Sequence, residues 1–205
     1  MNAYSYSLFN SSRAARSSGS NQPVINVRSA SLEDIPTLAT VLTDSFHPPG
    51  GLMYLMHPLF KLGVCEDLRS RLRSNSSKYN CLVAISKDSQ VTASKNVIVG
   101  TVEISVRSNC NSYSSIGSPY PYIANLAVDR PYRRQGVAKK LLTKCEQIAR
   151  TWGFSELSLH VLENNERAKK LYLGTGYKLI KIESNFSNWF LNTPRRLLLS
   201  KKIQL

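Results

Sequence analysis

The stretch Tyr122-Ile-Ala-Asn-Leu-Ala-Val-Asp-Arg-Pro-Tyr-Arg-Arg-Gln-Gly-Val-Ala-Lys-Lys-Leu-Leu142 contains a predicted strand, a short basic loop and the start of a predicted helix. The strand, 122–128, is uncharged and ends at Asp129 and Pro131, which favour turns. A loop that leads into a helix start presents free amide N–H groups and a favourable dipole to an anion. Gly136 allows the backbone to approach a ligand closely. The stretch therefore predicts a phosphate-binding loop. Apolar residues follow it at helical spacing, at Val137, Leu141, Cys145, Ile148, Ala149 and Trp152.

The loop matches neither of the two common nucleotide-binding patterns, G-x-x-x-x-G-K-[ST] and G-x-G-x-x-G. It resembles the [Q/R]-x-x-G-x-[G/A] loop of the GNAT acyltransferases, which holds the pyrophosphate of acetyl-CoA. The resemblance implies acetyl-CoA as co-substrate. The residues that match the loop are Arg133, Arg134, Gln135, Gly136, Val137 and Ala138.

A second motif follows in the order typical of that family. It is V-x-x-x-N-x-x-A-x-x-x-Y-x-x-x-G-[FY] and begins 25 residues after Gly136 on a predicted strand–helix unit. Its residues are Val161, Asn165, Ala168, Tyr172, Gly176 and Tyr177. Two motifs in the right order are more specific than either alone. The resemblance covers 24–205 and is tightest over 121–177.

The predicted elements fit the fold that this resemblance implies. That fold is of the α/β (α+β) class: a mixed central sheet of about six to seven strands, flanked by helices on both faces and splayed between its fourth and fifth strands. We expect strands at 24–28, 79–85, 96–106, 122–128, 154–161, 177–183 and 196–203. We expect helices at 31–46 and 52–74, from Gly136 onward, and at 162–176. The last two strands should form a hairpin, and 107–121 should be a loop.

Length and composition favour one globular domain, 22–205, after a flexible tail, 1–21. The chain is 42% hydrophobic and 20% charged, and no apolar run approaches the roughly 20 residues that cross a bilayer. The tail is rich in Ser and Asn, contains Arg13 and Arg16, and lacks the apolar region of a secretory signal. It is either a disordered tail or an organelle transit peptide, which leaves the cytoplasm or the plastid stroma as the location.

The net charge of +14 indicates anionic partners, yet the basic residues are scattered and match no RNA-binding signature. We therefore assign the charge partly to the acetyl-CoA phosphates. Proximity to the ribosome is compatible with it, and nucleic acid is not required. Four widely spaced cysteines and three unclustered histidines favour no metal site. Cys145 lies on the apolar face of its helix, which makes it a poor nucleophile.

Acyl transfer from a thioester to an amine requires removal of a proton from the amine and protonation of the leaving thiolate. Tyr122 and His160 match the positions used for deprotonation in one branch of N-terminal protein acetyltransferases. His is also the side chain best suited to proton transfer near neutral pH. The plainer interpretation of His160 is a strand histidine without a catalytic function. The resemblance assigns Tyr172 as general acid toward the CoA sulfur, which is compatible with a packed helix aromatic. Glu103 is a second candidate base or an ordinary solvent-facing carboxylate.

The resemblance also implies cofactor contacts. The backbone of Leu126, Ala127 and Val128 should pair with the pantetheine amides, and the Leu126 N–H should polarise the thioester carbonyl. Asn165 should bind the pantetheine arm or cap its helix. Lys139 and Lys140, next to the loop, either reach the phosphates or face solvent.

The function implied is an acetyl-CoA-dependent protein N-acetyltransferase. It would act on peptide N-terminal α-amines, lysine ε-amines or both, by direct attack in a ternary complex. The segment Asp67-Leu-Arg-Ser-Arg-Leu-Arg73 resembles plastid and cyanobacterial GNAT proteins. A small-molecule amine N-acetyltransferase and a non-catalytic acyl-CoA-binding or RNA-associated module are the other two hypotheses. Substrate choice should depend on 50–73, 107–121 and 185–194.

Overall fold

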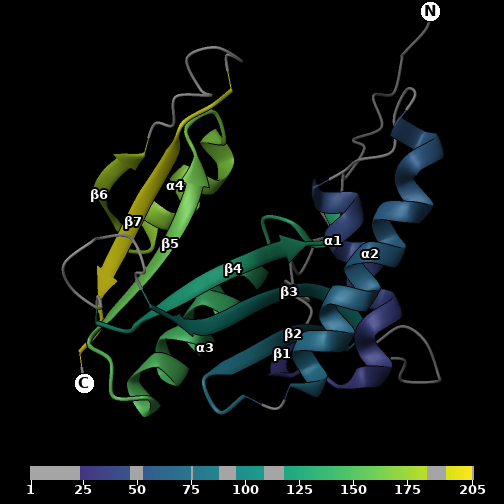
Figure 1. Cartoon of the computed structure of the whole chain (residues 1–205), viewed down its shortest axis with the longest axis horizontal. Helices are drawn as coiled ribbons and strands as arrows, with labels where there is room; N and C mark the ends of the chain where they lie inside the picture. Colours follow the sequence, from purple (N-terminus) through teal and green to yellow (C-terminus); the bar gives the residue numbers. More distant parts are fainter. Residues whose placement is uncertain are drawn as a thin grey trace, which may run out of the picture.

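A computed structural model of the chain describes residues 24–46, 53–74, 76–87, 96–108, 118–183 and 193–204. The tail predicted at 1–21 lies outside these residues. Within them, seven strands form one sheet in the order β1-β2-β3-β4-β5-β7-β6 (Figure 1). The strands are β1 (Val24–Ser29), β2 (Tyr79–Lys87), β3 (Asn96–Arg107), β4 (Tyr120–Val128), β5 (Glu156–Leu162), β6 (Lys178–Glu183) and β7 (Arg196–Lys202). The helices are α1 (Ile35–Phe46), α2 (Met53–Arg73), α3 (Val137–Thr151) and α4 (Glu166–Gly174), with short 3-10 turns η1 (Leu32–Asp34) and η2 (Arg130–Tyr132).

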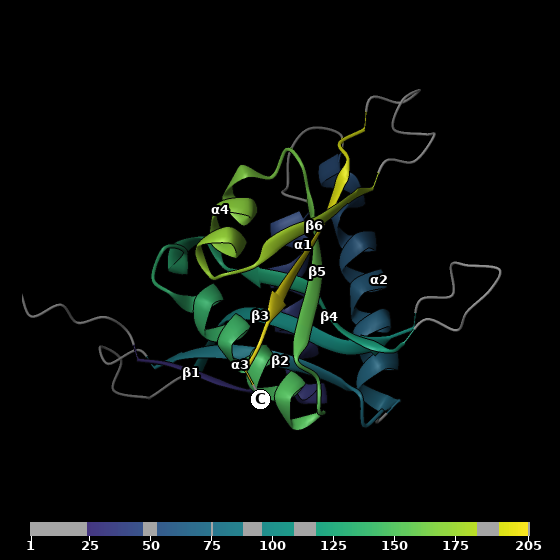
Figure 2. The ribbon, with the colours of Figure 1, turned by 90° about the vertical axis from the view of Figure 1, so that its left-hand side faces the viewer.

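Helices cover both faces of the sheet, as expected. Helices α1 and α2 pack on one face of the first strands, and α3 and α4 pack on the opposite face (Figure 2). Strand β2 is apolar on both faces and so can be covered on both. Leu82 and Ala84 point into the core under α3, whereas Cys81 and Val83 point into the core under α1 and α2. A strand that is covered on both sides is apolar at successive positions rather than at alternate ones.

Strands β4 and β5 are parallel and separate soon after they meet. Their pairing is confined to Tyr122 with Ser158 and Ile123 with Leu159. From there the two strands diverge, which Figure 1 shows as the opening between the long arrows of β4 and β5. The splay expected between the fourth and fifth strands is confirmed.

Strand β4 also bulges where the splay opens. Its register against β3 shifts between Thr101 and Glu103, and Asn125 adopts a left-handed backbone with φ of 52°. Asn tolerates this conformation better than most residues. A bulge changes the direction of the strand, so the β4 backbone beyond Ala124 turns away from β5.

The predicted hairpin of the last two strands is confirmed, with β7 between β5 and β6. Element ends differ from the prediction by a few residues, which is the usual uncertainty of boundaries. Helix 31–46 begins as the 3-10 turn η1, and β3 and β4 extend into both ends of the predicted loop 107–121. Arg107 and Tyr120 are therefore strand residues opposite each other. Among the described segments, no helix has both the length and the apolarity to cross a membrane.

Candidate active site

Tyr122 and His160 lie together where β4 and β5 begin to separate. The register that pairs Tyr122 with Ser158 places His160 one residue pair further along β5, on the same face of the sheet. The Tyr122 hydroxyl is 2.9 Å from His160 Nδ1, and the ring centroids are 5.6 Å apart. Two residues 38 positions apart in the chain are thus joined by a hydrogen bond at the base of the splay.

The other ring nitrogen of His160 contacts Glu183, the last residue of β6. Nε2 lies 3.0 Å from Glu183 Oε2. An ionised carboxylate can only accept hydrogen bonds, so this contact places the proton of a neutral imidazole on Nε2. Nδ1 is then an acceptor, and the Tyr122 hydroxyl donates to it.

Positive charge surrounds this pair. The Arg107 guanidinium lies over the Tyr122 ring, 3.6 Å from its centroid, which is within the range of a cation–π contact. Burial and the positive charges of Arg196 and Arg107 lower the pKa of His160, and Glu183 opposes this shift. Because the free imidazole has a pKa of about 6.5, His160 is neutral near neutral pH and can accept a proton.

Tyr172 lies on α4, in the core under α3 and α4. It is 8% exposed, and its ring packs against Tyr177 with centroids 5.9 Å apart. Burial raises its pKa to about 12, with a smaller contribution from Tyr122. No described residue forms a hydrogen bond with its hydroxyl, which remains protonated and available as a donor. The Tyr172 ring can pack in the core while its hydroxyl donates a proton, and this proton donation stays a prediction.

The predicted anion loop has the expected form. Arg133, Arg134, Gln135 and Gly136 are exposed, and Gly136 caps α3 in the left-handed conformation with φ of 80°. Residues Val137 and Ala138 form the first turn of α3, where helix amides have no partner within the helix. A dipole and free N–H groups therefore face solvent at this point.

Several side chains of the loop stabilise its shape. Arg133 Nε donates to the Val128 carbonyl at 2.8 Å, and Gln135 Nε2 donates to the Pro131 carbonyl at 3.0 Å. Arg134 has a left-handed φ of 66°, so the loop holds two left-handed residues in three positions. These contacts indicate a structural contribution from Arg133 and Gln135 in addition to any charge or hydrogen bond offered to a ligand.

The remaining predicted cofactor residues lie on β4 and at the start of α4. Leu126, Ala127 and Val128 are on the part of β4 beyond its pairing with β5. Asn165 accepts a hydrogen bond from the Ala168 N–H at 3.1 Å, which is the helix-capping geometry. Lys140 Nζ donates to the Ile25 carbonyl at 3.3 Å rather than facing solvent alone.

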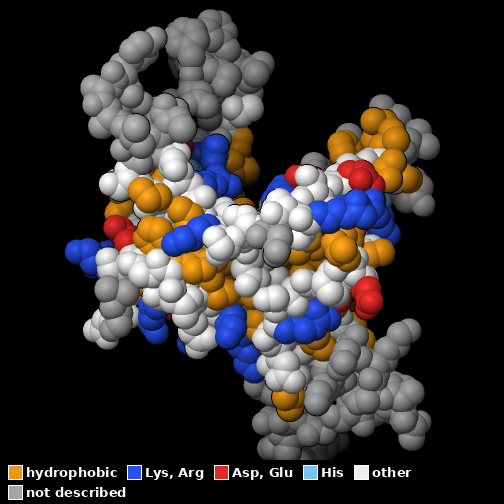
Figure 3. Space-filling view, turned by 60° about the horizontal axis from the view of Figure 1, so that its bottom comes forward, with side chains coloured by type: hydrophobic (Ala, Val, Ile, Leu, Met, Phe, Trp, Pro, Cys, Tyr) orange, Lys and Arg blue, Asp and Glu red, His pale blue; other side chains and the backbone are white. Residues whose placement is uncertain are grey.

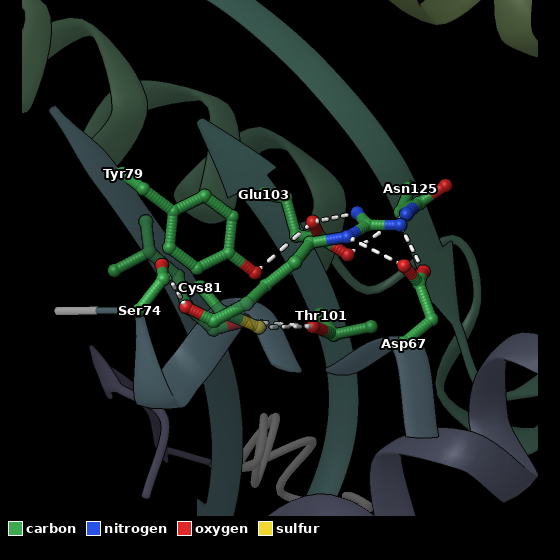
Figure 4. Close-up of polar contacts among 9 residues, drawn as sticks. Asp67, Ser74, Tyr79, Cys81, Thr101, Glu103 and Asn125 are labelled. Atoms are coloured by element: carbon green, nitrogen blue, oxygen red, sulfur yellow. Dashed lines mark hydrogen bonds and ion pairs between the residues drawn. The ribbon is translucent and has the colours of Figure 1, made fainter. Parts of the chain in front are cut away.

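Glu103 is not the solvent-facing carboxylate that was one of the two expectations for it. It is 3% exposed, and it is held by Arg71 at 2.5 Å, Asn125 Nδ2 at 2.8 Å and the Tyr79 hydroxyl at 3.1 Å (Figure 4). Arg71 on α2 reaches inward to make this ion pair while also pairing with Asp67. The Glu103 carboxylate thus links α2, β2 and β4 through three hydrogen bonds, and its use as a general base stays a prediction.

A cavity of about 320 Å³ lies above this network. It is bounded by α1, α2, Glu103 and Asn125, with apolar walls that include Leu42 and Leu68. Thr43, which also lines it, has a buried hydroxyl without a hydrogen-bond partner in the described part of the chain. The cavity adjoins the β4 bulge, on the face of the sheet covered by α1 and α2.

Cys145 is fully buried under the sheet, as predicted. Burial raises the pKa of its thiol, so the reactive thiolate is disfavoured. In the described segments, no three His, Cys, Asp or Glu side chains are grouped closely enough to hold a metal ion. The Lys and Arg side chains on the face shown in Figure 3 are spread over the surface and form no single patch.

Two members of the site, Glu183 and Arg107, had no signal in the sequence. Each is an ordinary charged residue at the end of a strand. Their proximity to Tyr122 and His160 depends on sheet order, because β6 is separated from β5 by β7. Knowledge of the strand register would have been needed to find them.

Comparison with known proteins shows the family and the fold. The sequence model described as the acetyltransferase (GNAT) family matches residues 56–177, more than half of the chain. One curated relative, the chloroplastic GCN5-related N-acetyltransferase 10 of Arabidopsis thaliana, is 28% identical over 174 residues. That alignment covers 83% of this chain and 68% of the relative.

Two solved structures have the same fold. The NatC complex bound to Gag peptide and CoA contains a chain that matches with a TM-score of 0.62 at 17% identity, covering 88% of this chain and 99% of its own. Arabidopsis thaliana NAA60 in complex with a bisubstrate analogue matches with a TM-score of 0.60 at 19% identity, covering 88% and 100%.

Proposed function

This chain belongs to the acetyltransferase (GNAT) family, and from that membership we propose that it transfers the acetyl group of acetyl-CoA to a peptide or protein amine. The N-terminal α-amine is the preferred acceptor in this proposal. The observation that carries it is the hydrogen bond between Tyr122 and His160 at the base of the splay, with Glu183 on the far side of the imidazole.

The residues present fit acetyl-CoA. The exposed first turn of α3, with Gly136 left-handed at its start, offers unpaired amides and a positive dipole end to a pyrophosphate. The guanidinium groups of Arg133 and Arg134 add positive charge there. Beyond Ile123 the β4 edge is not paired with β5, so its backbone groups can bind the pantetheine amides. Bound acetyl-CoA supplies an activated thioester.

Two proton transfers are needed, and in this proposal they use side chains from opposite faces of the sheet. Tyr122 and neutral His160 take the proton that the acceptor amine loses as it attacks the thioester carbonyl. The buried Tyr172 hydroxyl donates to the sulfur that leaves, because its raised pKa keeps the phenol protonated. The backbone N–H of Leu126, next to the bulge, is placed to stabilise the carbonyl oxygen in this proposal.

A peptide acceptor is favoured over a small amine by three observations. The Tyr122 and His160 positions match those of N-terminal protein acetyltransferases, and the NatC structure was solved with a peptide and CoA. In addition, the chain carries a net charge of +14, which disfavours polycationic small substrates such as polyamines. The chloroplastic name of the Arabidopsis relative favours the plastid stroma over the cytoplasm as its location.

The test is acetylation by the purified chain with radiolabelled acetyl-CoA and three matched acceptors. These are a lysine-free peptide with a free N-terminus, an N-terminally blocked peptide with one internal lysine, and spermidine. We expect labelling of the first peptide, with or without the second. Labelling of spermidine alone would assign a small-molecule function, and binding of acetyl-CoA without labelling of any amine would indicate a non-catalytic module.

A further inference from the structure

The contact between Glu183 and His160 spans an intervening strand. Glu183 lies directly opposite Arg196 on β7, whereas His160 lies opposite Leu198 on the other side of β7. A glutamate in this register would be expected to pair with the arginine facing it. No ion pair joins Glu183 and Arg196 in the described structure; instead the carboxylate reaches His160 Nε2 at 3.0 Å.

We propose that Glu183 is a positioning residue, which holds His160 in its Nε2–H tautomer so that Nδ1 accepts the Tyr122 proton and the Tyr122 oxygen faces the acceptor amine. This inference rests on the proposed function for the identity of the reaction. The hydrogen-bonded chain Tyr122–His160–Glu183 runs from β4 through β5 to β6. His160 is only 14% exposed at its side chain, so few water molecules compete for its two nitrogens.

The proton transfers balance along this chain. The acceptor nitrogen forms a bond to the acetyl carbon, and the carbon–sulfur bond breaks. The proton lost by that nitrogen passes to the Tyr122 oxygen, while the Tyr122 hydroxyl proton passes to His160 Nδ1. His160 becomes an imidazolium with a proton on each nitrogen, and its positive charge lies against the Glu183 carboxylate. The thiolate takes a proton from Tyr172.

The charged groups around the imidazole determine how strongly Glu183 affects the basicity of His160. Arg196 on β7 and Arg107 on β3 disfavour a positive His160, and the Tyr122 phenol on β4 is its other hydrogen-bond partner. Glu183 on β6 is the group that favours the imidazolium. Without Glu183, two cations would face His160 unopposed. The imidazole would then be a weaker base, and either ring nitrogen could carry its proton.

The experiment compares Glu183→Gln, Glu183→Ala and Glu183→Asp with wild type. Glu163→Gln is the matched control, because Glu163 is likewise a glutamate at the end of a strand, following β5, but its carboxylate pairs with Arg195 and makes no contact with His160 in the described structure. We expect both Glu183→Gln and Glu183→Ala to lower kcat at least about tenfold at unchanged KM for acetyl-CoA. The acidic limb of the pH–rate profile should move to lower pH, since His160 loses its favourable charge. Glu183→Asp should recover part of kcat.

A spectroscopic measurement tests the same inference without turnover. Nitrogen-15 NMR of the imidazole, assigned with a His160→Gln variant, should show the Nε2–H tautomer in wild type and a mixture of tautomers in Glu183→Ala. An Nδ1–H tautomer in wild type would overturn the positioning assignment. So would wild-type kcat and an unmoved acidic limb in a folded Glu183→Gln variant, judged by circular dichroism.

Failure of the inference and failure of the proposed function are separable. If wild type acetylates no amine, the proposed function fails, and the tautomer measurement still decides what Glu183 does to the imidazole. If wild type is active but Glu183→Gln and Glu163→Gln behave alike in both kcat and pH profile, the inference about Glu183 fails alone.

Discussion

His160 is subject to opposing influences within a single imidazole. Burial and two arginines, Arg196 and Arg107, lower its pKa, whereas Glu183 partly restores it. Its hydrogen bonds to Tyr122 and Glu183 use both ring nitrogens, so neither its orientation nor its protonation is left to solvent. A structural histidine in a strand can satisfy both ring nitrogens in the same way, so the catalytic function of His160 stays a prediction.

The lowered pKa of His160 predicts the pH dependence of the enzyme. In the proposed function the neutral imidazole is the base, and its lowered pKa keeps it neutral to a pH below the ordinary value of about 6.5. Once the titration of the acceptor amine, with an ordinary pKa of about 7.7–8.0, is divided out, acetyl transfer should stay constant from pH 8 to pH 7 and fall only in acid, below about pH 6.5. The measurement is kcat/KM against pH with a lysine-free peptide, using acceptor amines of different pKa to separate their titration from that of the enzyme.

His160→Ala provides the control for this profile. It should lower kcat by about 10²-fold and leave the Kd for acetyl-CoA unchanged. An acidic limb that persists in the His160→Ala variant would assign the base to another group.

At the scale of elements, three local features shape the chain from β4 to α3. The bulge at Asn125 turns the strand away from β5, the η2 turn reverses the chain, and Gly136 begins α3 in a conformation that glycine adopts freely. The first turn of α3 is thereby exposed at the end of the open β4 edge. Each feature depends on residues close together in the chain, which is why the sequence pattern predicted the strand, turn and helix of this segment.

Gly136→Ala tests the loop at this scale. A methyl group on Gly136 meets no atom within 4 Å, so the effect is confined to backbone strain of about 1–2 kcal/mol at φ of 80°. Relief of that strain should change the loop and weaken acetyl-CoA binding by about tenfold, measured by calorimetry.

Gly153→Ala is the matched control for this substitution. Gly153 has φ of 83°, also without an atom within 4 Å, but it follows the other end of α3. It should cost similar stability and leave the Kd for acetyl-CoA unchanged. Equal losses of affinity in the two variants would contradict a specific function of the loop.

At the scale of the whole molecule, one sheet is covered by helices to different extents at its two ends. Helices α1 and α2 cover the face of β2 and β3, whereas the same face of β5 carries His160 and Ser158, which are partly exposed. The Arg71–Glu103 ion pair ties α2 to β3, and Glu103 in turn holds Asn125 at the bulge. The packing of a helix layer is thus linked to the shape of the reactive strand.

Arg71→Met tests this link. It leaves the 3%-exposed Glu103 carboxylate without its cation, which should lower the free energy of unfolding by about 1–3 kcal/mol. Arg69→Met is the control, because within the described residues Arg69 pairs with the exposed Glu66 alone and should change stability by less than about 1 kcal/mol. Urea denaturation measures both. Similar values for the two variants would mean that the Glu103 network contributes little to stability.

Much of the fold could be predicted from local patterns. The strand 122–128, the glycine-led helix and the second motif at Val161 and Asn165 are contiguous in the chain, and their periodicity and turn residues act over a few positions. Tyr122 and His160 were found because their motifs carry them. Glu183, Arg107 and the partners of Glu103 were not found, because strands that are distant in the chain bring them together.

The sequence by itself determined the local elements and the glycine-led loop before α3, since hydrogen bonding and burial periodicity within a segment depend on that segment's own residues. Only the tertiary structure decided which charged groups face one another. The order β5-β7-β6 brings Glu183 to His160, and the packing of α2 brings Arg71 to Glu103. The physical reason is that electrostatic contacts depend on distance in space, and sheet order and helix packing set that distance independently of separation along the chain.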